Sequence, residues 1–185
     1  MKTPLSIACR IVVAATLGCV PASLLAQSQS WDQKIDTPNR FKVLKTFNDE
    51  AVLDQETGLV WEKIPEADSL GGWAFIDDEC FAHFTGGRLG WRPPTLEEML
   101  SLMDPLQNET GKLPPGHPFD LGGTRDILRQ FWTLSTAIVQ PANNNFAYVA
   151  NFEPGGSFFS DPKIAPTHRF WCVRGGHGYD GNNVP

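Results

Sequence analysis

Apolar and polar residues alternate over two neighbouring stretches early in the main body of the chain. Residues 41–53 mix apolar and polar positions, and residues 52–62 form two β-prone runs joined by a turn that starts at Asp54 and reaches Gly58. Aspartate and glycine between two such runs are a hairpin signal. We therefore predict a strand entering at Phe41, followed by a hairpin over residues 52–62.

The spacing of apolar residues then changes to that of a helix. Between the glycine pairs at 71–72 and 86–87, apolar residues recur every three or four positions. They are Trp73, Ile76, Cys80 and Phe84. The acidic residues 77–79 lie among them and indicate a solvated face, because adjacent helical positions point about 100° apart and cannot converge on one cation. This pattern predicts a first helix with Cys80 on its buried side.

A second helix is predicted to begin after Thr95. Thr95 and Glu98 have the spacing of a capping box, in which each side chain satisfies a backbone N–H that the first helical turn leaves free. The apolar stripe that follows consists of Leu96, Met99, Leu100 and Met103. Asp104-Pro105 ends this helix, because proline cannot continue it.

The remainder of the chain contains a long irregular segment and then more strands. Residues 104–130 are rich in proline and glycine, and a loop of that length is usually functional or mobile. Strands are predicted at 131–139, 146–152, 158–159 and 169–174, with the turn Glu153-Pro154-Gly155-Gly156 between the second and the third. Strands first, two helices next and strands last are typical of an α+β fold.

The N-terminal residues resemble a secretory signal peptide. Lys2 and Arg10 precede the uncharged run 11–25, which is shorter than the about 20 apolar residues that span a bilayer. We expect cleavage after Ala26, with Ala22 or lipoprotein processing at Cys19 as alternatives. The predicted parts are a signal peptide (1–26), a flexible leader (27–40), one domain (41–176) and a tail (177–185). The product would be periplasmic or secreted by a bacterium through the Sec route.

Charge and cysteine count narrow the partners and the compartment. The net charge of −6 becomes −8 once Lys2 and Arg10 are removed, which argues against nucleic acid and anionic lipid as partners. We also expect no membrane insertion after signal cleavage. Cys80 and Cys172 are the cysteines left after residue 26. In an oxidising compartment two cysteines form a disulfide in a single possible way, and two buried free thiols are the alternative.

Several short segments in a fixed order carry a family resemblance over residues 50–175. They are Leu53-Asp54-x-x-Thr57-Gly58-Leu59-Val60-Trp61, Trp73-Ala74 followed by Cys80, Gly87-x-x-x-Trp91-Arg92-x-Pro94-Thr95 with Glu98, Phe131-Trp132, and Cys172-Val173-Arg174. As an ordered set they resemble the Lcl C-terminal domain family, named for a bacterial collagen-like adhesin. Pro93 departs from the pattern, since the family usually carries leucine there, and a proline suits a strand end or edge.

The resemblance implies a C-type-lectin-like fold, with two helices flanking a small, twisted, mainly antiparallel sheet and one disulfide. In such folds a cysteine of the first helix pairs with one of the last strand, which matches Cys80 and Cys172. The resemblance also implies an extracytoplasmic domain. The namesake adhesin binds sulfated polysaccharide, but a net charge of −8 opposes a polyanion and the chain has no collagen-like repeat, so we do not transfer that ligand.

No pattern of catalytic or metal-ligating residues stands out. The histidines at 83, 117, 168 and 177 show no pair at zinc-ligand spacing. Residues 140–142 and 153–155 lack the third oxygen ligand of calcium-dependent sugar sites, and Ser135 lies outside a Gly-x-Ser-x-Gly elbow.

Tryptophans 61, 73, 91, 132 and 171 fall on predicted core faces. Arg92 and Arg174 are interpreted as donors to backbone. We expect no metal, no cofactor and no enzyme activity.

The candidate ligand-binding residues are those on irregular backbone, where recognition residues concentrate. They are Asn143, Asn144 and Asn145 in one loop and His117 and Phe119 in another, although ordinary turns use the same residue types. We expect a non-catalytic extracytoplasmic recognition module that binds a glycan or an envelope protein. The alternatives are a structural subunit of an envelope assembly and an enzyme of unknown reaction. The pattern sets no oligomeric state.

Overall fold

The computed structural model describes residues 34–37, 39–65, 70–107, 111–122, 129–139, 143–165 and 168–175. The predicted signal peptide (1–26), the leader before residue 34 and the tail (177–185) lie outside these ranges. Within the described ranges, no helix has the length and apolar character that crossing a bilayer requires.

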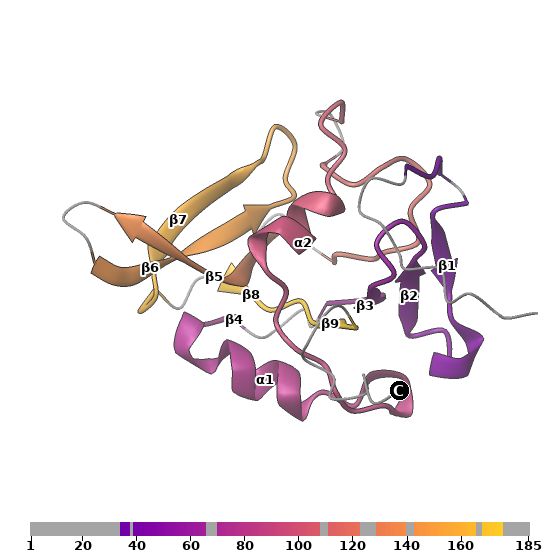
Figure 1. Cartoon of the computed structure of the whole chain (residues 1–185), viewed down its shortest axis with the longest axis horizontal. Coiled ribbons are helices and arrows are strands. Elements are labelled where there is room, and N and C mark those ends of the chain that lie inside the picture. Colours follow the sequence, from indigo (N-terminus) through magenta and orange to yellow (C-terminus); the bar gives the residue numbers. More distant parts are fainter. Residues whose placement is uncertain are drawn as a thin grey trace, which may run out of the picture.

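Helices and strands follow one another as an α+β chain (Figure 1). In order they are β1 (Phe41–Val43), the 3-10 turn η1 (Lys45–Phe47), β2 (Ala51–Asp54), β3 (Val60–Glu62), β4 (Leu70–Gly71), η2 (Trp73–Phe75), α1 (Ile76–Ala82), η3 (Thr85–Gly87), α2 (Leu96–Ser101), β5 (Gln130–Val139), β6 (Asn143–Asn151), β7 (Phe158–Pro162), β8 (His168–Arg169) and β9 (Val173–Arg174).

The first sheet has the order β1-β2-β3-β9 and is antiparallel throughout. Its β2–β3 hairpin, predicted from the sequence, closes around the buried Asp54. This carboxylate accepts hydrogen bonds from Thr57 Oγ1 at 2.9 Å and from the Glu56 N–H at 3.1 Å. Gly58 has a φ of 75°, a backbone conformation that side-chain-bearing residues rarely adopt. The Asp-x-x-Thr-Gly motif therefore stabilises this turn through the Asp54 carboxylate and the positive φ of Gly58.

The second sheet has the order β4-β8-β5-β6-β7, with β5 and β8 parallel and the other pairs antiparallel. β6 begins at Asn143, which pairs with Val139 of β5, so the Asn143–Asn145 run belongs to a strand. The sequence pattern predicts a loop there, and this prediction is wrong. The antiparallel ladder already begins before Phe146, the first apolar residue of β6, because backbone groups, and not side chains, make its hydrogen bonds.

The last predicted strand, 169–174, is two strands in two different sheets. β8 pairs in the second sheet and β9 in the first, and residues 170–172 cross between them. Trp171 and Cys172 on this crossing are fully buried. The single small sheet that we expected is therefore a pair of mainly antiparallel sheets joined by one buried segment.

The first helix is shorter than its apolar pattern. α1 ends at Ala82, and His83 has extended backbone (φ −65°, ψ 135°). Ile76 and Cys80 are buried as predicted, but Phe84 is 64% exposed, because helical spacing no longer applies beyond residue 82. Asp77 and Asp78 are exposed, in agreement with the predicted solvated face.

The second helix has the predicted capping box. Thr95 Oγ1 accepts from the Glu98 N–H at 3.3 Å, and the Glu98 carboxylate accepts from the Thr95 N–H at 2.8 Å. Ser135 of β5 accepts a hydrogen bond from the Leu96 N–H at 3.0 Å, where the β5–β6 register shifts. Ser135 thus serves the start of a helix.

The two helices pack against opposite faces of the second sheet. Phe131 and Trp132 are neighbours on β5, so their side chains point to opposite faces. Phe131 packs in the same cluster as Met99 of α2, whereas Trp132 packs with Ile76 of α1.

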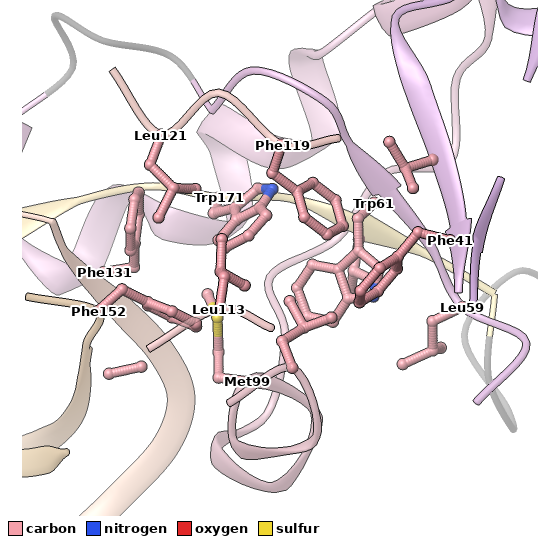
Figure 2. Packing of buried hydrophobic residues seen from close by; sticks show 14 residues of the cluster. Phe41, Leu59, Trp61, Met99, Leu113, Phe119, Leu121, Phe131, Phe152 and Trp171 are labelled. Atoms are coloured by element: carbon pink, nitrogen blue, oxygen red, sulfur yellow. The ribbon is translucent and has the colours of Figure 1, made fainter. Parts of the chain in front are cut away.

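The largest core cluster is built around Trp171 (Figure 2). The ring of Trp171 lies 5.2–5.6 Å, between centroids, from the rings of Trp61, Phe119, Phe131 and Phe152. Trp171 Nε1 donates to the Glu62 carbonyl at 2.9 Å. The tryptophans at 61, 91, 132 and 171 are buried, which confirms their predicted core role; Trp73 is half-buried.

Candidate functional site

The irregular segment 111–122 forms the candidate site and is bonded to the core along its length. The Lys112 N–H donates to the Phe152 carbonyl at 3.3 Å, and the Lys112 carbonyl accepts from the Asp104 N–H at 2.7 Å. Near the other end, the Asp120 N–H donates to the Lys63 carbonyl at 2.9 Å. The buried guanidinium of Arg169 donates to the Leu121 carbonyl. Contacts to residues far away in the sequence therefore set the position of this segment.

Phe119 anchors the segment in the core. It is 6% exposed, and its ring lies edge-on to those of Phe41 and Trp171, at 5.2 Å between centroids in both cases. The sequence analysis predicts Phe119 to be exposed on a loop and to contact a ligand. The predicted exposure is wrong, because the ring completes the aromatic cluster around Trp171.

A pocket of about 280 Å³ lies over this segment. Its lining combines cationic, imidazole and carboxylate side chains with glycine backbone and a few apolar groups. The lining residues are Gly111, Lys112, Leu113, Pro115, Gly116, His117, Phe119, Asp120, Leu121, Arg129 and Phe152. Most come from 111–121, but Arg129 and Phe152 come from the chain before β5 and after β6.

The imidazole of His117 is held in this pocket by a ring contact and a hydrogen bond. Its ring stacks on Phe119, at 6.0 Å between centroids and 26° between planes. Nδ1 accepts a hydrogen bond from the Phe119 N–H at 3.1 Å, so the neutral ring carries its proton on Nε2. Burial, and secondarily the positive charge of Arg129, lowers the pKa of His117 below the usual 6.5. At neutral pH His117 is therefore an uncharged hydrogen-bond donor.

The other polar groups add both donors and an acceptor. Lys112 and Arg129 bring two cationic side chains to the lining, while Asp120 is exposed and brings a carboxylate. Asp120 Oδ1 accepts from the Gly122 N–H at 2.9 Å, which holds this carboxylate in a local turn. The Arg129 N–H donates to Glu153 Oε1 at 2.6 Å, which ties the start of β5 to the turn after β6.

The structure does not bring the Asn143–Asn145 run to this pocket, since none of its residues is in the lining. Asn145 is exposed on β6, and its carbonyl accepts from the Lys163 N–H at 2.7 Å. The side chains of Asn143 and Asn144 lie outside the described part of the chain. Of the five predicted residues, the structure therefore assembles His117 and Phe119. Lys112 and Arg129 also line the pocket, and no local pattern in the sequence predicts that they do.

A second hollow, of about 420 Å³, lies beside Arg40, Glu56 and α2. Arg40 donates to both carboxylate oxygens of Asp54, at 2.9 and 2.8 Å, and lies 2.9 Å from Glu56 Oε2. Burial raises the pKa of Glu56, against the opposing effect of Arg40. The guanidinium of Arg40 is thus paired with carboxylates of the protein itself, and we assign Arg40, Asp54 and Glu56 a structural role.

The remaining motif residues also serve the fold. Arg92 donates to both Glu98 carboxylate oxygens, at 2.8 and 2.6 Å, and to the carbonyls of Pro93 and Gly175. The predicted backbone contacts of Arg92 are confirmed, and the Glu98 pair adds to them. Arg174 lies over the ring of Phe47, at 5.9 Å from its centroid.

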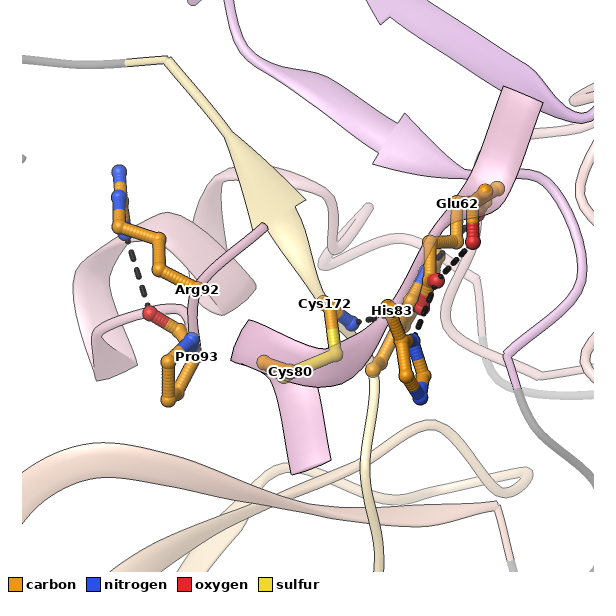
Figure 3. The surroundings of a disulfide bond; sticks show 8 residues. Glu62, Cys80, His83, Arg92, Pro93 and Cys172 are labelled. Atoms are coloured by element: carbon orange, nitrogen blue, oxygen red, sulfur yellow. Dashed lines mark hydrogen bonds and ion pairs between the residues drawn. A yellow bond between two sulfur atoms is a disulfide. The ribbon is translucent and has the colours of Figure 1, made fainter. Parts of the chain in front are cut away.

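The disulfide predicted from the cysteine count joins α1 to the segment before β9 (Figure 3). Cys80 and Cys172 are bonded, with their Cα atoms 5.5 Å apart, and both are fully buried. Their bond ties together residues that are 92 positions apart in the sequence. It therefore links α1 to the crossing between the two sheets.

Comparisons with known proteins agree with the motif order. The family model for the Lcl C-terminal domain matches residues 50–174, which span both helices, the disulfide and every described strand except β1. No curated protein and no solved structure matches the chain. The matched family is an adhesin-type one, which suggests an extracellular location. Because the match covers more than half of the sequence, this chain belongs to the Lcl C-terminal domain family.

Proposed function

We propose that this protein is a non-catalytic extracytoplasmic recognition module, and that its ligand is a glycan bound at the 111–121 pocket. The observation that carries the proposal is the composition of that pocket. The lining brings the imidazole of His117 and the cationic side chains of Lys112 and Arg129 beside the carboxylate of Asp120. Sugar hydroxyls both donate and accept, so a mixed set of this kind suits a polyhydroxylated ligand.

The scaffold supports recognition because its parts are already positioned. Segment 111–122 is bonded to residues of several core elements, and the disulfide ties α1 to the crossing between the sheets. A pocket that is formed before binding loses less entropy when a ligand enters. We propose the C-type-lectin-like arrangement for this scaffold; the mainly antiparallel sheets and the helix-to-strand disulfide support it.

The compartment is part of the proposal. A basic start, a short apolar run and a disulfide in the main domain all favour export. Intact-mass analysis of the protein recovered from the bacterial envelope or medium should show loss of about the first 26 residues. An intact Met1-Lys2 terminus would contradict export by this route.

Binding of the oxidised protein to a glycan panel tests the ligand class. His117→Ala and Asp120→Asn should each weaken glycan binding, because each removes a polar group from the pocket. Glu97→Gln, an exposed acid beside the second hollow, is the matched control and should bind normally. EDTA should leave binding unchanged. Unchanged affinity in both pocket variants, sensitivity to EDTA, or turnover of the ligand would each count against the proposal.

An envelope protein is the second candidate partner, because aromatic residues are exposed around α1. Phe75, Phe81 and Phe84 are 59%, 77% and 64% exposed. Soluble proteins usually keep such groups scattered singly. If a protein is the ligand, Phe81→Ser should abolish binding to purified envelope proteins, and His117→Ala should not.

A further inference from the structure

A second group of chemically competent side chains surrounds the disulfide. Ligand atoms of Glu62, His83 and Cys172 all lie within 4.8 Å of one another. The Cys172 sulfur is bonded to that of Cys80, so a fourth potential ligand adjoins the group (Figure 3). The pocket at 111–121 contains none of these residues.

Three elements hold these side chains in place. Cys80 and His83 are three positions apart at the end of α1, where the His83 N–H donates to the Cys80 carbonyl at 3.2 Å. Glu62 lies on β3, and Cys172 directly precedes β9. The arrangement therefore comes from the tertiary fold, with a Cys-x-x-His pair supplying one half of it.

The Glu62 carboxylate is fixed beside the sulfur atoms. Its Oε1 lies 2.7 Å from His83 Nδ1 and accepts from Thr85 Oγ1 at 2.6 Å. Its Oε2 accepts from the Cys172 N–H at 3.1 Å. Glu62 is 2% exposed, so its orientation is set by these protein groups.

We propose that the reduced protein binds one Zn²⁺ ion at Cys80, His83, Cys172 and Glu62. Two thiolates, one imidazole nitrogen and one carboxylate oxygen are ligand types that zinc takes in tetrahedral sites. While the disulfide is intact, the sulfur atoms are bonded to each other and no thiolate is available. The disulfide and the metal are therefore alternative links between α1 and the segment before β9.

The step that opens the site is thiol–disulfide exchange. Two thiols of a reductant are oxidised to a disulfide, and the Cys80–Cys172 bond takes up the two electrons and two protons to give two thiols. Binding of Zn²⁺ to the two thiolates then releases both thiol protons. Both cysteines are fully buried, so exchange requires opening of the structure or a chain whose disulfide has not yet formed.

Metal binding to the reduced chain should be coupled to folding. The four ligands come from positions 62, 80, 83 and 172, so an unfolded chain does not present them together. Zinc would thus stabilise the reduced fold by holding the elements that the disulfide otherwise joins. The thermal midpoint of the reduced protein should rise with Zn²⁺ concentration.

Zinc titration of both redox states tests the proposal. The full chain carrying Cys9→Ser and Cys19→Ser contains only the two relevant cysteines. It is reduced in denaturant, refolded without oxygen and titrated with Zn²⁺ against a chromophoric chelator. We expect one equivalent bound in the reduced state and none in the oxidised state. Substitution by Co²⁺ should give the absorption of a tetrahedral site with sulfur ligands.

Variants distinguish zinc binding at this four-residue site from zinc binding by the two thiols of an unfolded chain. His83→Ala and Glu62→Gln should each weaken zinc binding by about tenfold or more. Asp77→Asn, an exposed acid on the same helix, should bind zinc as the parent does. Near-UV circular dichroism of the oxidised variants checks their folding, and His83→Ala decides the question if Glu62→Gln does not fold. No zinc bound by the reduced parent, or equal affinity in His83→Ala, would overturn the proposal.

Discussion

Replacement of Phe119 by alanine tests whether this side chain stabilises the core or serves to contact a ligand. The ring is 6% exposed and contacts Phe41 and Trp171 edge-on at 5.2 Å between centroids. The imidazole of His117 covers it at 6.0 Å. Phe119→Ala removes all of these contacts at once and leaves a cavity beneath the pocket.

The expected cost follows from this packing. Truncation of a buried phenylalanine to alanine typically lowers the free energy of unfolding by about 3–5 kcal/mol. Edge-to-face aromatic pairs contribute about 0.5–1.5 kcal/mol each beyond the area that they bury. With two such pairs and almost complete burial, Phe119→Ala should lie in the upper half of the about 3–5 kcal/mol range.

Urea unfolding of the oxidised protein, followed by tryptophan fluorescence, measures this cost. Phe81→Ala is the matched control, because Phe81 is 77% exposed on α1 and its truncation should change stability by less than about 0.5 kcal/mol. A loss below about 1 kcal/mol for Phe119→Ala, against the about 3 kcal/mol expected at minimum, would refute the assignment of this ring to the core.

Three further changes test the helix cap, the pocket histidine and the disulfide. Thr95→Ala should lower stability by about 1 kcal/mol in urea unfolding, because the capping hydrogen bond to the first turn of α2 is lost. The pKa of His117 is lower in the folded protein than the 6.5 of an unfolded chain. Between these two pKa values the unfolded chain therefore binds more protons than the folded protein. The stabilising contribution of His117 is present above pH 6.5 and is lost as the pH falls through the folded-state pKa. His117→Gln should therefore flatten the pH dependence of stability in that window, relative to the parent; an unchanged slope would contradict the shift. Replacing Cys80 and Cys172 together by serine opens a loop of 92 residues and should cost about 4–5 kcal/mol in the chain-entropy model. In the full chain carrying Cys9→Ser and Cys19→Ser, thiol titration after unfolding without reductant should detect no free thiol, whereas two free thiols would contradict the disulfide.

Local features could be predicted where a few neighbouring residues contain the whole interaction. The Thr95–Glu98 capping box involves residues three positions apart, and the turn after Asp54 closes within five residues. Periodicity also placed Cys80 on the buried face of α1. These interactions depend little on the rest of the fold, so the sequence pattern is sufficient to find them.

Prediction failed where the backbone changed direction or continued a ladder. Phe84 kept the apolar spacing of α1 but lies beyond the helix end, and is exposed. Asn143 is a residue type that is common in loops, but it pairs with Val139 at the start of β6. The strand expected at 169–174 divides between two sheets at Trp171. In each case contacts made elsewhere in the chain outweighed the local pattern.

The sequence by itself determined the α+β class, the cysteine pair, the cap, the hairpin and the family. Only the tertiary structure decided that Phe119 lies in the core, and that Lys112, His117 and Arg129 share one pocket. Segment 111–122 has no hydrophobic period, and its position depends on hydrogen bonds to residues such as Lys63 and Arg169. Such long-range bonds leave no periodic signal in the sequence. The conformation of irregular backbone depends on which buried donors and acceptors still need a hydrogen-bond partner once the sheets have packed.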